Sequence, residues 1–214
     1  MSKDLLAVAK ESGVANKVQA VVTDSAANIS AAIKLTGFTH LYCFAHVLNL
    51  VVQNGIKTLH YLQLKVKSIV EHFHRRTVAA EKLLVLQRQM RPKHNVVKLK
   101  NDVITRWNST YDMFQRMCQI QEPLDAAIAV LQKPVKSLSS DEWSTLRELC
   151  KVLKPFDLVT REISSEQAVT VSKVIVVKCF SQLTMIHCVV AHSSTVLTVL
   201  FPNLPHEILP GKWR

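Results

Sequence analysis

Apolar positions in the first part of the chain predict a helix, strand, helix, strand order. Residues 1–13 place leucines, a valine and alanines on one side and end at a glycine, as a helix does. Residues 17–24 hold a run of apolar, mostly β-branched side chains that is typical of a buried strand. A second helix is expected over residues 25–35 and a second strand over residues 39–44. This order predicts a strand, helix, strand step of an α/β sheet.

After residue 45 the apolar positions recur every three or four residues, which is the period of an amphipathic helix. The expected helices cover residues 46–53, 59–73, 78–90, 107–121, 123–131, 140–163 and 172–190. Ser139 and Ser140 supply N-cap hydroxyls for the longest of them, and Asp141 and Glu142 supply acids for its first turn. Residues 191–214 contain three prolines and little periodicity, so we expect an irregular tail there.

Composition supports a compact protein that is rich in helix. Hydrophobic residues make up 48% of the 214 positions, which is enough to bury a substantial core. Four glycines, seven prolines and 6% aromatic residues disfavour an all-β sandwich with many tight turns. Together with the pattern along the chain, this composition favours an α/β region followed by a mostly α region.

The charge of the chain favours a polyanionic partner. It has 27 Lys and Arg against 16 Asp and Glu, a formal net charge of +11. Such an excess favours nucleic acid as the partner first and an anionic membrane surface second. Basic side chains that bind phosphates displace the counterions held around them, and this release favours binding. No apolar run approaches the roughly 20 residues that span a bilayer, so no membrane segment is expected. Five scattered cysteines without a CxxC pair are typical of reduced thiols in the cytosol or nucleus.

Most of the excess charge is local, since residues 57–100 contain eleven Lys or Arg and two acids. A helical region with one basic face suits contact with a phosphate backbone; the alternative is an ordinary solvated helix face. Farther on, Trp107 beside Arg106 either stacks on an unpaired base while the guanidinium holds a phosphate, or anchors the core at a helix start. The candidate nucleic-acid-binding residues are Lys65, Lys67, Arg75, Arg76, Arg88, Arg106 and Trp107.

Asp24 is the candidate for chemistry, because it ends the first strand just before a helix. Open α/β sheets place catalytic groups at such strand ends, and a carboxylate there can bind a divalent cation; the alternative is a helix N-cap. Cys43 and His46 have CxxH spacing, but no second pair of zinc ligands follows at a finger-like distance, so we interpret both as structural. The sequence has no Walker A, GxGxxG or GxSxG motif, so nucleotide hydrolysis, dinucleotide chemistry and the α/β-hydrolase mechanism have no support.

Three segments occur in the order and approximate spacing of landmarks in hAT-type transposases. They are VVTDSAAN at residues 21–28, CFAHVLNL at residues 43–50 and TRWNST at residues 105–110. From about residue 17 to about residue 190 the chain resembles this superfamily, which includes domesticated relatives such as the zinc finger BED domain-containing proteins. The resemblance implies a ribonuclease-H-like core interrupted by a large helical insertion. Residues 1–56 would then be part of that core and residues 57–190 the insertion.

The resemblance also implies roles for single residues. Transposases of this type cut and join DNA with an Asp, Asp, Glu triad that binds Mg²⁺ or Mn²⁺, and Asp24 matches the second acid. Trp107 matches an aromatic residue that handles a flipped base or hairpin end, and Cys43 and His46 match paired residues near the start of the insertion. The other two acids and the segment through which the full-length family homodimerises are not recognised in this chain. One carboxylate cannot hold two metal ions, so we expect no metal cofactor and an incomplete catalytic site.

The sequence therefore predicts a DNA-binding protein of the nucleus, derived from a hAT transposase and not an enzyme by itself. One alternative is a metal-dependent DNA transposase, a polynucleotidyl transferase, that needs acids from elsewhere. Another is a helical scaffold for protein interactions, which an exposed apolar stripe on the helix at residues 59–73 would favour.

Overall fold

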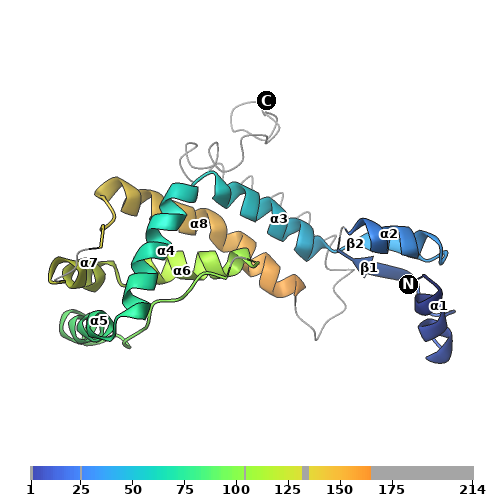
Figure 1. Cartoon of the computed structure of the whole chain (residues 1–214), viewed down its shortest axis with the longest axis horizontal. Coiled ribbons are helices and arrows are strands. Elements are labelled where there is room, and N and C mark those ends of the chain that lie inside the picture. The colour runs from blue at the N-terminus through green and yellow to red at the C-terminus, as the bar shows by residue number, and fades with distance from the viewer. Residues whose placement is uncertain (1, 25, 104, 132–134, 165–214) are drawn as a thin grey trace, which may run out of the picture. The chain divides into compact units, whose positions relative to one another are not determined.

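The computed structural model describes residues 2–24, 26–103, 105–131 and 135–164. The described part is mostly helical, with eight helices and two short strands (Figure 1). The chain divides into two compact units, one up to Val51 and one from Val52 onward. The predicted division after residue 56 falls slightly later, within the same helix α3 (Phe44–Lys57). The helix predicted over residues 172–190 and the tail over residues 191–214 lie outside the described residues.

The first unit is built around a parallel pair of strands. Its elements before α3 are α1 (Ser2–Glu11), β1 (Ala20–Thr23), α2 (Ala27–Lys34) and β2 (Thr39–Tyr42). Ala20 lies opposite Thr39, and Thr23 lies opposite Tyr42. Helix α2 connects the strands and lies against both of them, with Ile33 fully buried (Figure 1). The predicted strand, helix, strand step is confirmed.

These strands are shorter and more exposed than the sequence suggests. The apolar run predicts a buried strand over residues 17–24, yet β1 has four residues, of which Val22 is 47% exposed and the other three are half-buried. Successive side chains of a strand point to opposite faces, and only a covered face buries them. The prediction of a buried strand was therefore wrong: β-branched residues indicate a strand, but not how many of its faces are covered.

The second unit is a packed group of helices. After the end of α3 it contains α4 (His60–Arg75), α5 (Thr77–Met90), α6 (Trp107–Gln119), α7 (Gln121–Ala129) and α8 (Ser140–Ile163). Helix α6 packs along α8 and α5 along α7, while α4 contacts both α5 and α6 (Figure 1). The predicted helices of this region are confirmed to within a few residues at each end. Their apolar faces form the core, with side chains such as Ile69, Phe114, Leu124, Leu149 and Leu153 almost fully buried.

The start of α8 shows how local sequence fixes a helix end. The Ser139 hydroxyl accepts a hydrogen bond from the Glu142 backbone N–H at 3.2 Å, and the Glu142 carboxylate accepts one from the Ser139 N–H at 2.7 Å. This reciprocal capping box satisfies two donors that have no partner inside the helix. The predicted N-cap is confirmed. Within the described residues, no helix combines the length and apolar character needed to cross a membrane.

Candidate functional site

Some basic residues of the second unit form ion pairs with acidic residues of helices α6 and α8. Lys65 on α4 contacts Glu142 on α8 at 2.6 Å, with side chains only 17% and 20% exposed. Lys100 contacts Asp112 on α6 at 2.8 Å. These cations are neutralised by carboxylates within the fold. Lys65, a predicted phosphate contact, therefore adds little free charge to the surface.

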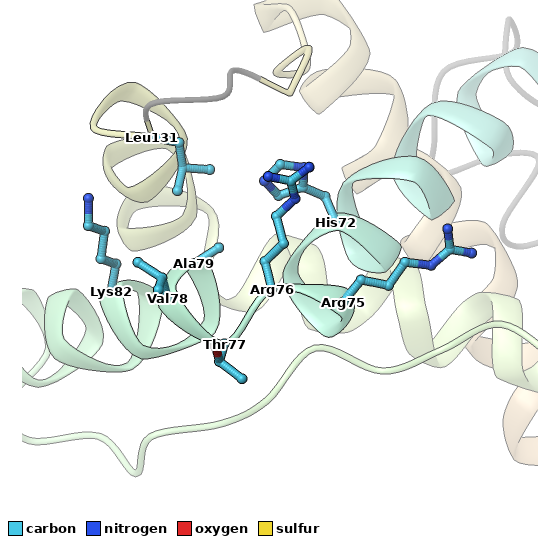
Figure 2. Close-up of a pocket in the computed structure, with 8 residues that line it drawn as sticks. All are labelled: His72, Arg75, Arg76, Thr77, Val78, Ala79, Lys82 and Leu131. Carbon is cyan, nitrogen blue, oxygen red and sulfur yellow. The ribbon is translucent and has the colours of Figure 1, made fainter.

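Other basic residues gather where α4 ends and α5 begins. Here a cavity of ≈ 420 Å³, named below the α4–α5 pocket, opens between the two helices and the end of α7. Its lining residues are His72, Arg75, Arg76, Thr77, Val78, Ala79, Lys82 and Leu131. Figure 2 shows Arg76 reaching alongside the His72 ring while Arg75 points away from them. Three cations thus border one cavity, and none of its described lining residues is acidic.

The backbone at this junction adds to the positive potential. Arg76 is extended (φ −128°, ψ 105°) and serves as both the C-cap of α4 and the N-cap of α5, without a side-chain cap for α5. The first N–H groups of a helix have no partner inside it, and they carry the positive end of the helix dipole. Thr77, Val78 and Ala79 form this first turn and line the pocket. Anions are favoured at such a helix start, and here side-chain cations lie beside it.

Further contacts affect the charges of three residues that line the pocket, His72, Lys82 and Arg75. Burial, and next the charge of Arg76, lower the pKa of His72 from its ordinary value of 6.5, so its imidazole is mostly neutral at pH 7. Lys82 donates a hydrogen bond to the Val130 carbonyl at 3.3 Å, which holds its ammonium near the end of α7. Arg75 lies 3.4 Å from Glu71, but its side chain is 79% exposed, so this ion pair neutralises it weakly.

Other predicted contacts do not join this pocket. Lys67 lines a separate cavity of ≈ 430 Å³ together with Lys57, His60 and Asp102. Arg88 is exposed on α5, and Arg106 is exposed at the N-cap of α6. Of the seven residues predicted to bind nucleic acid, the structure therefore brings together Arg75 and Arg76 in the α4–α5 pocket.

Trp107 is buried, with 1% of its surface exposed and its ring centroid 6.3 Å from that of Tyr111. A buried indole has no open face on which a base could stack, so the structure corrects the stacking interpretation in favour of the core anchor. The polar residues that follow Trp107 are also structural. Asn108 donates to Asp157 on α8 at 2.7 Å, and Thr110 donates to Asp102 at 2.7 Å.

Asp24 is exposed directly after β1, and its carboxylate accepts a hydrogen bond from the Ala26 N–H at 3.3 Å. The N-cap residue of α2 is Ala26, two residues after Asp24, so the alternative prediction that Asp24 is the N-cap was wrong. Cys43 and His46 are half-buried, and their interpretation as structural residues stays a prediction. Across the described ranges, no group of three or more His, Cys, Asp or Glu could hold a metal ion.

Sequence reasoning missed His72, Lys82 and Leu131 as members of the pocket. The one available signal was that His72, Arg75 and Arg76 crowd the end of a predicted helix directly before the next one begins. Leu131 follows the end of α7, and its place depends on the packing of α5 against α7. Tertiary contacts of this kind leave no local trace in the sequence.

Comparison with known proteins gives consistent results. Residues 41–152 match the model of the ZBED1 RNase-like helical domain. The chain is 30% identical to the human zinc finger BED domain-containing protein 4 over 163 residues, 74% of this chain and 13% of that protein. It is 30% identical to the human zinc finger BED domain-containing protein 6 over 156 residues, 69% of this chain and 15% of that protein. It is 26% identical to a putative AC transposase of Zea mays over 174 residues, 78% of this chain and 21% of that protein. The chain thus spans about a fifth or less of each relative.

Proposed function

The chain belongs to the ZBED1 RNase-like helical domain family, and on that premise we propose that it binds DNA through the cations of the α4–α5 pocket. The relatives include a putative AC transposase and zinc finger BED domain-containing proteins, which supports descent from a hAT-type transposase. We propose the nucleus as the place of action on the same ground, since one further relative is named a putative transcriptional regulator.

One observation carries the proposal: Arg75, Arg76 and Lys82 line the same cavity as the first turn of α5. A cavity of ≈ 420 Å³ is far larger than the ~30 Å³ share of one water, so it has room for a phosphate group. Guanidinium groups bind phosphate oxygens in a bidentate manner, and backbone N–H groups at a helix start bind them too. The pocket therefore suits the sugar–phosphate backbone.

Sequence-independent contact is the expected mode. Direct readout of bases relies mostly on residues such as Asn, Gln and Arg that reach base edges in a groove. The described lining holds no Asn or Gln, and its arginines lie beside a helix start suited to phosphate. We therefore propose backbone binding that orients the chain on DNA without reading the base sequence.

The first unit is proposed to be part of a ribonuclease-H-like core. Strands β1 and β2 pair in parallel and are connected by α2, and this supports the proposal because such a strand, helix, strand step is a building block of α/β sheets. Asp24 lies at the expected end of β1, but a single exposed carboxylate does not fit a site for Mg²⁺ or Mn²⁺ among the described residues. No catalytic step follows from these residues.

The scaffold alternative has less support. On α4 the apolar residues Tyr61 and Leu64 are 72% and 51% exposed, whereas Leu62, Val66 and Ile69 are buried in the core. Two exposed side chains do not form the continuous stripe that a docking face for a partner helix requires.

The test uses fluorescence anisotropy to measure how tightly the 214-residue chain binds a mixed-sequence DNA duplex at several salt concentrations. Each phosphate neutralised contributes about −0.9 to the slope of log K against log salt. Arg76→Gln should make the slope shallower by about 0.9, which corresponds to about eightfold weaker binding at about 0.1 M salt. Lys154→Gln is the matched control, because Lys154 is exposed on α8 and does not line the pocket. Equal behaviour of both variants, or no binding at low salt, would refute the proposal.

A further inference from the structure

Helices α6 and α8 run antiparallel along one another in the second unit. At one end of the pair, Asn108 on α6 donates to Asp157 on α8 at 2.7 Å. At the other end, Arg147 on α8 donates at 2.7 Å to Gln121, which begins α7 just after α6. Residue numbers increase along α6 in the direction in which they decrease along α8. Between these two contacts, successive residues of α6 therefore face residues of α8 in reverse sequence order.

Cys118 on α6 and Cys150 on α8 occupy such facing positions, close enough that each thiol is the largest single influence on the pKa of the other. Both are free and half-buried. The contact makes the two thiols unequal. The interaction with Cys150 lowers the pKa of Cys118, and the nearby charge of Arg147 lowers it further, whereas the interaction with Cys118 and burial raise the pKa of Cys150.

We propose that Cys118 and Cys150 form a modification site, a dithiol that hydroperoxides oxidise to a disulfide between α6 and α8. Thiolates, not thiols, attack peroxides, and redox-active cysteines are partly accessible and lie next to a second cysteine that resolves the intermediate. Here the lowered pKa of Cys118 gives it the attacking role, and Cys150, which faces it, has the resolving role. Neither cysteine lines the α4–α5 pocket, so this proposal does not rest on the proposed DNA binding.

The chemistry balances with hydrogen peroxide as the oxidant. The Cys118 thiolate attacks one peroxide oxygen, the O–O bond breaks, and Cys118 becomes a sulfenic acid while the departing hydroxide takes up a proton to give water. The sulfur of Cys150 then attacks the sulfur of Cys118 and gives up its proton. The S–O bond breaks, and the leaving hydroxide combines with that proton as a second water. Two thiols and one peroxide yield one disulfide and two waters.

The experiment treats the full chain with graded hydrogen peroxide and maps its peptides without reduction by mass spectrometry. The expected product is a linked pair of peptides containing Cys118 and Cys150, with the loss of two hydrogens, at lower peroxide than any bond that involves Cys43, Cys179 or Cys188. Thiol-reducing agents should reverse it. Failure of this pair to form, or preferential formation of another pair, would overturn the proposal.

Two variants separate the roles of the thiols. Cys150→Ser should leave Cys118 as a sulfenic acid that a dimedone probe labels, whereas Cys118→Ser should abolish both the label and the disulfide. Cys43→Ser is the matched control, because Cys43 is also free and half-buried but lies in the other unit, and it should keep the disulfide. Equal labelling of Cys118→Ser and Cys150→Ser would contradict the assigned roles. If a serine variant does not fold, the peptide map of the unaltered chain still decides the main claim.

Discussion

Replacing Trp107 with phenylalanine separates a role of this residue in the core from a role in stacking on DNA bases. The side chain is 1% exposed and packs near Tyr111. A buried tryptophan removes about 150–250 Å² from water, which at about 25 cal/mol per Å² corresponds to about 4–6 kcal/mol. Measured truncations of such residues to alanine cost about 3–5 kcal/mol.

That magnitude decides which variant to use. Small domains unfold with a free energy of only about 5–15 kcal/mol, so Trp107→Ala is expected to leave the second unit marginal or unfolded. Trp107→Phe keeps an aromatic ring in the site and should lower the free energy of unfolding by about 1–3 kcal/mol. Urea unfolding followed by far-UV circular dichroism measures this loss without relying on the fluorescence of the residue removed.

The same variant is then tested for DNA binding under conditions in which it is fully folded. A core role predicts unchanged affinity for both duplex and single-stranded DNA. A stacking role predicts weaker binding to single-stranded DNA, because base stacking on an aromatic ring contributes about 1–3 kcal/mol per base. Normal stability combined with weakened binding would refute the buried position of Trp107.

Three further predictions concern the helix contacts of the second unit. Ser139→Ala removes the cap of α8 and should lower the free energy of unfolding by about 1 kcal/mol; an unchanged urea midpoint would contradict the capping box. The pKa of Glu142 is lowered, mainly by the hydrogen bond from Lys65. The stability from this contact is therefore fully present above the unfolded pKa of ~4.3 and is lost as the pH falls through the lower pKa of the folded state. Glu142→Gln, which can keep the capping box, should therefore weaken the acid dependence of the melting temperature, and an identical pH profile would count against the ion pair. Asp157→Ala leaves the Asn108 amide without its acceptor and should cost about 1–3 kcal/mol, and additivity with Asn108→Ala would show that the two do not interact.

The helices of the second unit could be predicted from the sequence because their signals are local. Apolar residues at helical spacing in α4, such as Leu62, Val66 and Ile69, are the residues that the structure buries. Ser139 and Glu142 likewise mark the start of α8 within four residues of sequence. Signals of this kind depend only on helix geometry, so they can be recognised without knowing how the rest of the chain packs.

The candidate site could be predicted only in part. The local excess of Lys and Arg is visible in the sequence, but which cations remain available depends on partners far along the chain. Lys65 is neutralised by a residue 77 positions away, whereas Arg76 remains exposed at a helix junction. Trp107 and Val22 show the same limit in opposite directions, one buried where stacking was considered and the other exposed where burial was expected. Burial is decided by tertiary packing, which no short motif encodes.

Photo-crosslinking from inside the α4–α5 pocket tests the central claim most directly. A photoreactive phenylalanine analogue replaces Val78, which lines the pocket and is 63% exposed, and a matched analogue replaces Leu158, which is 59% exposed on α8. After irradiation with a mixed-sequence duplex, we expect a DNA adduct from position 78, lost at high salt, and little adduct from position 158. Equal yields from the two positions, or an adduct from position 158 alone, would contradict DNA binding through this pocket.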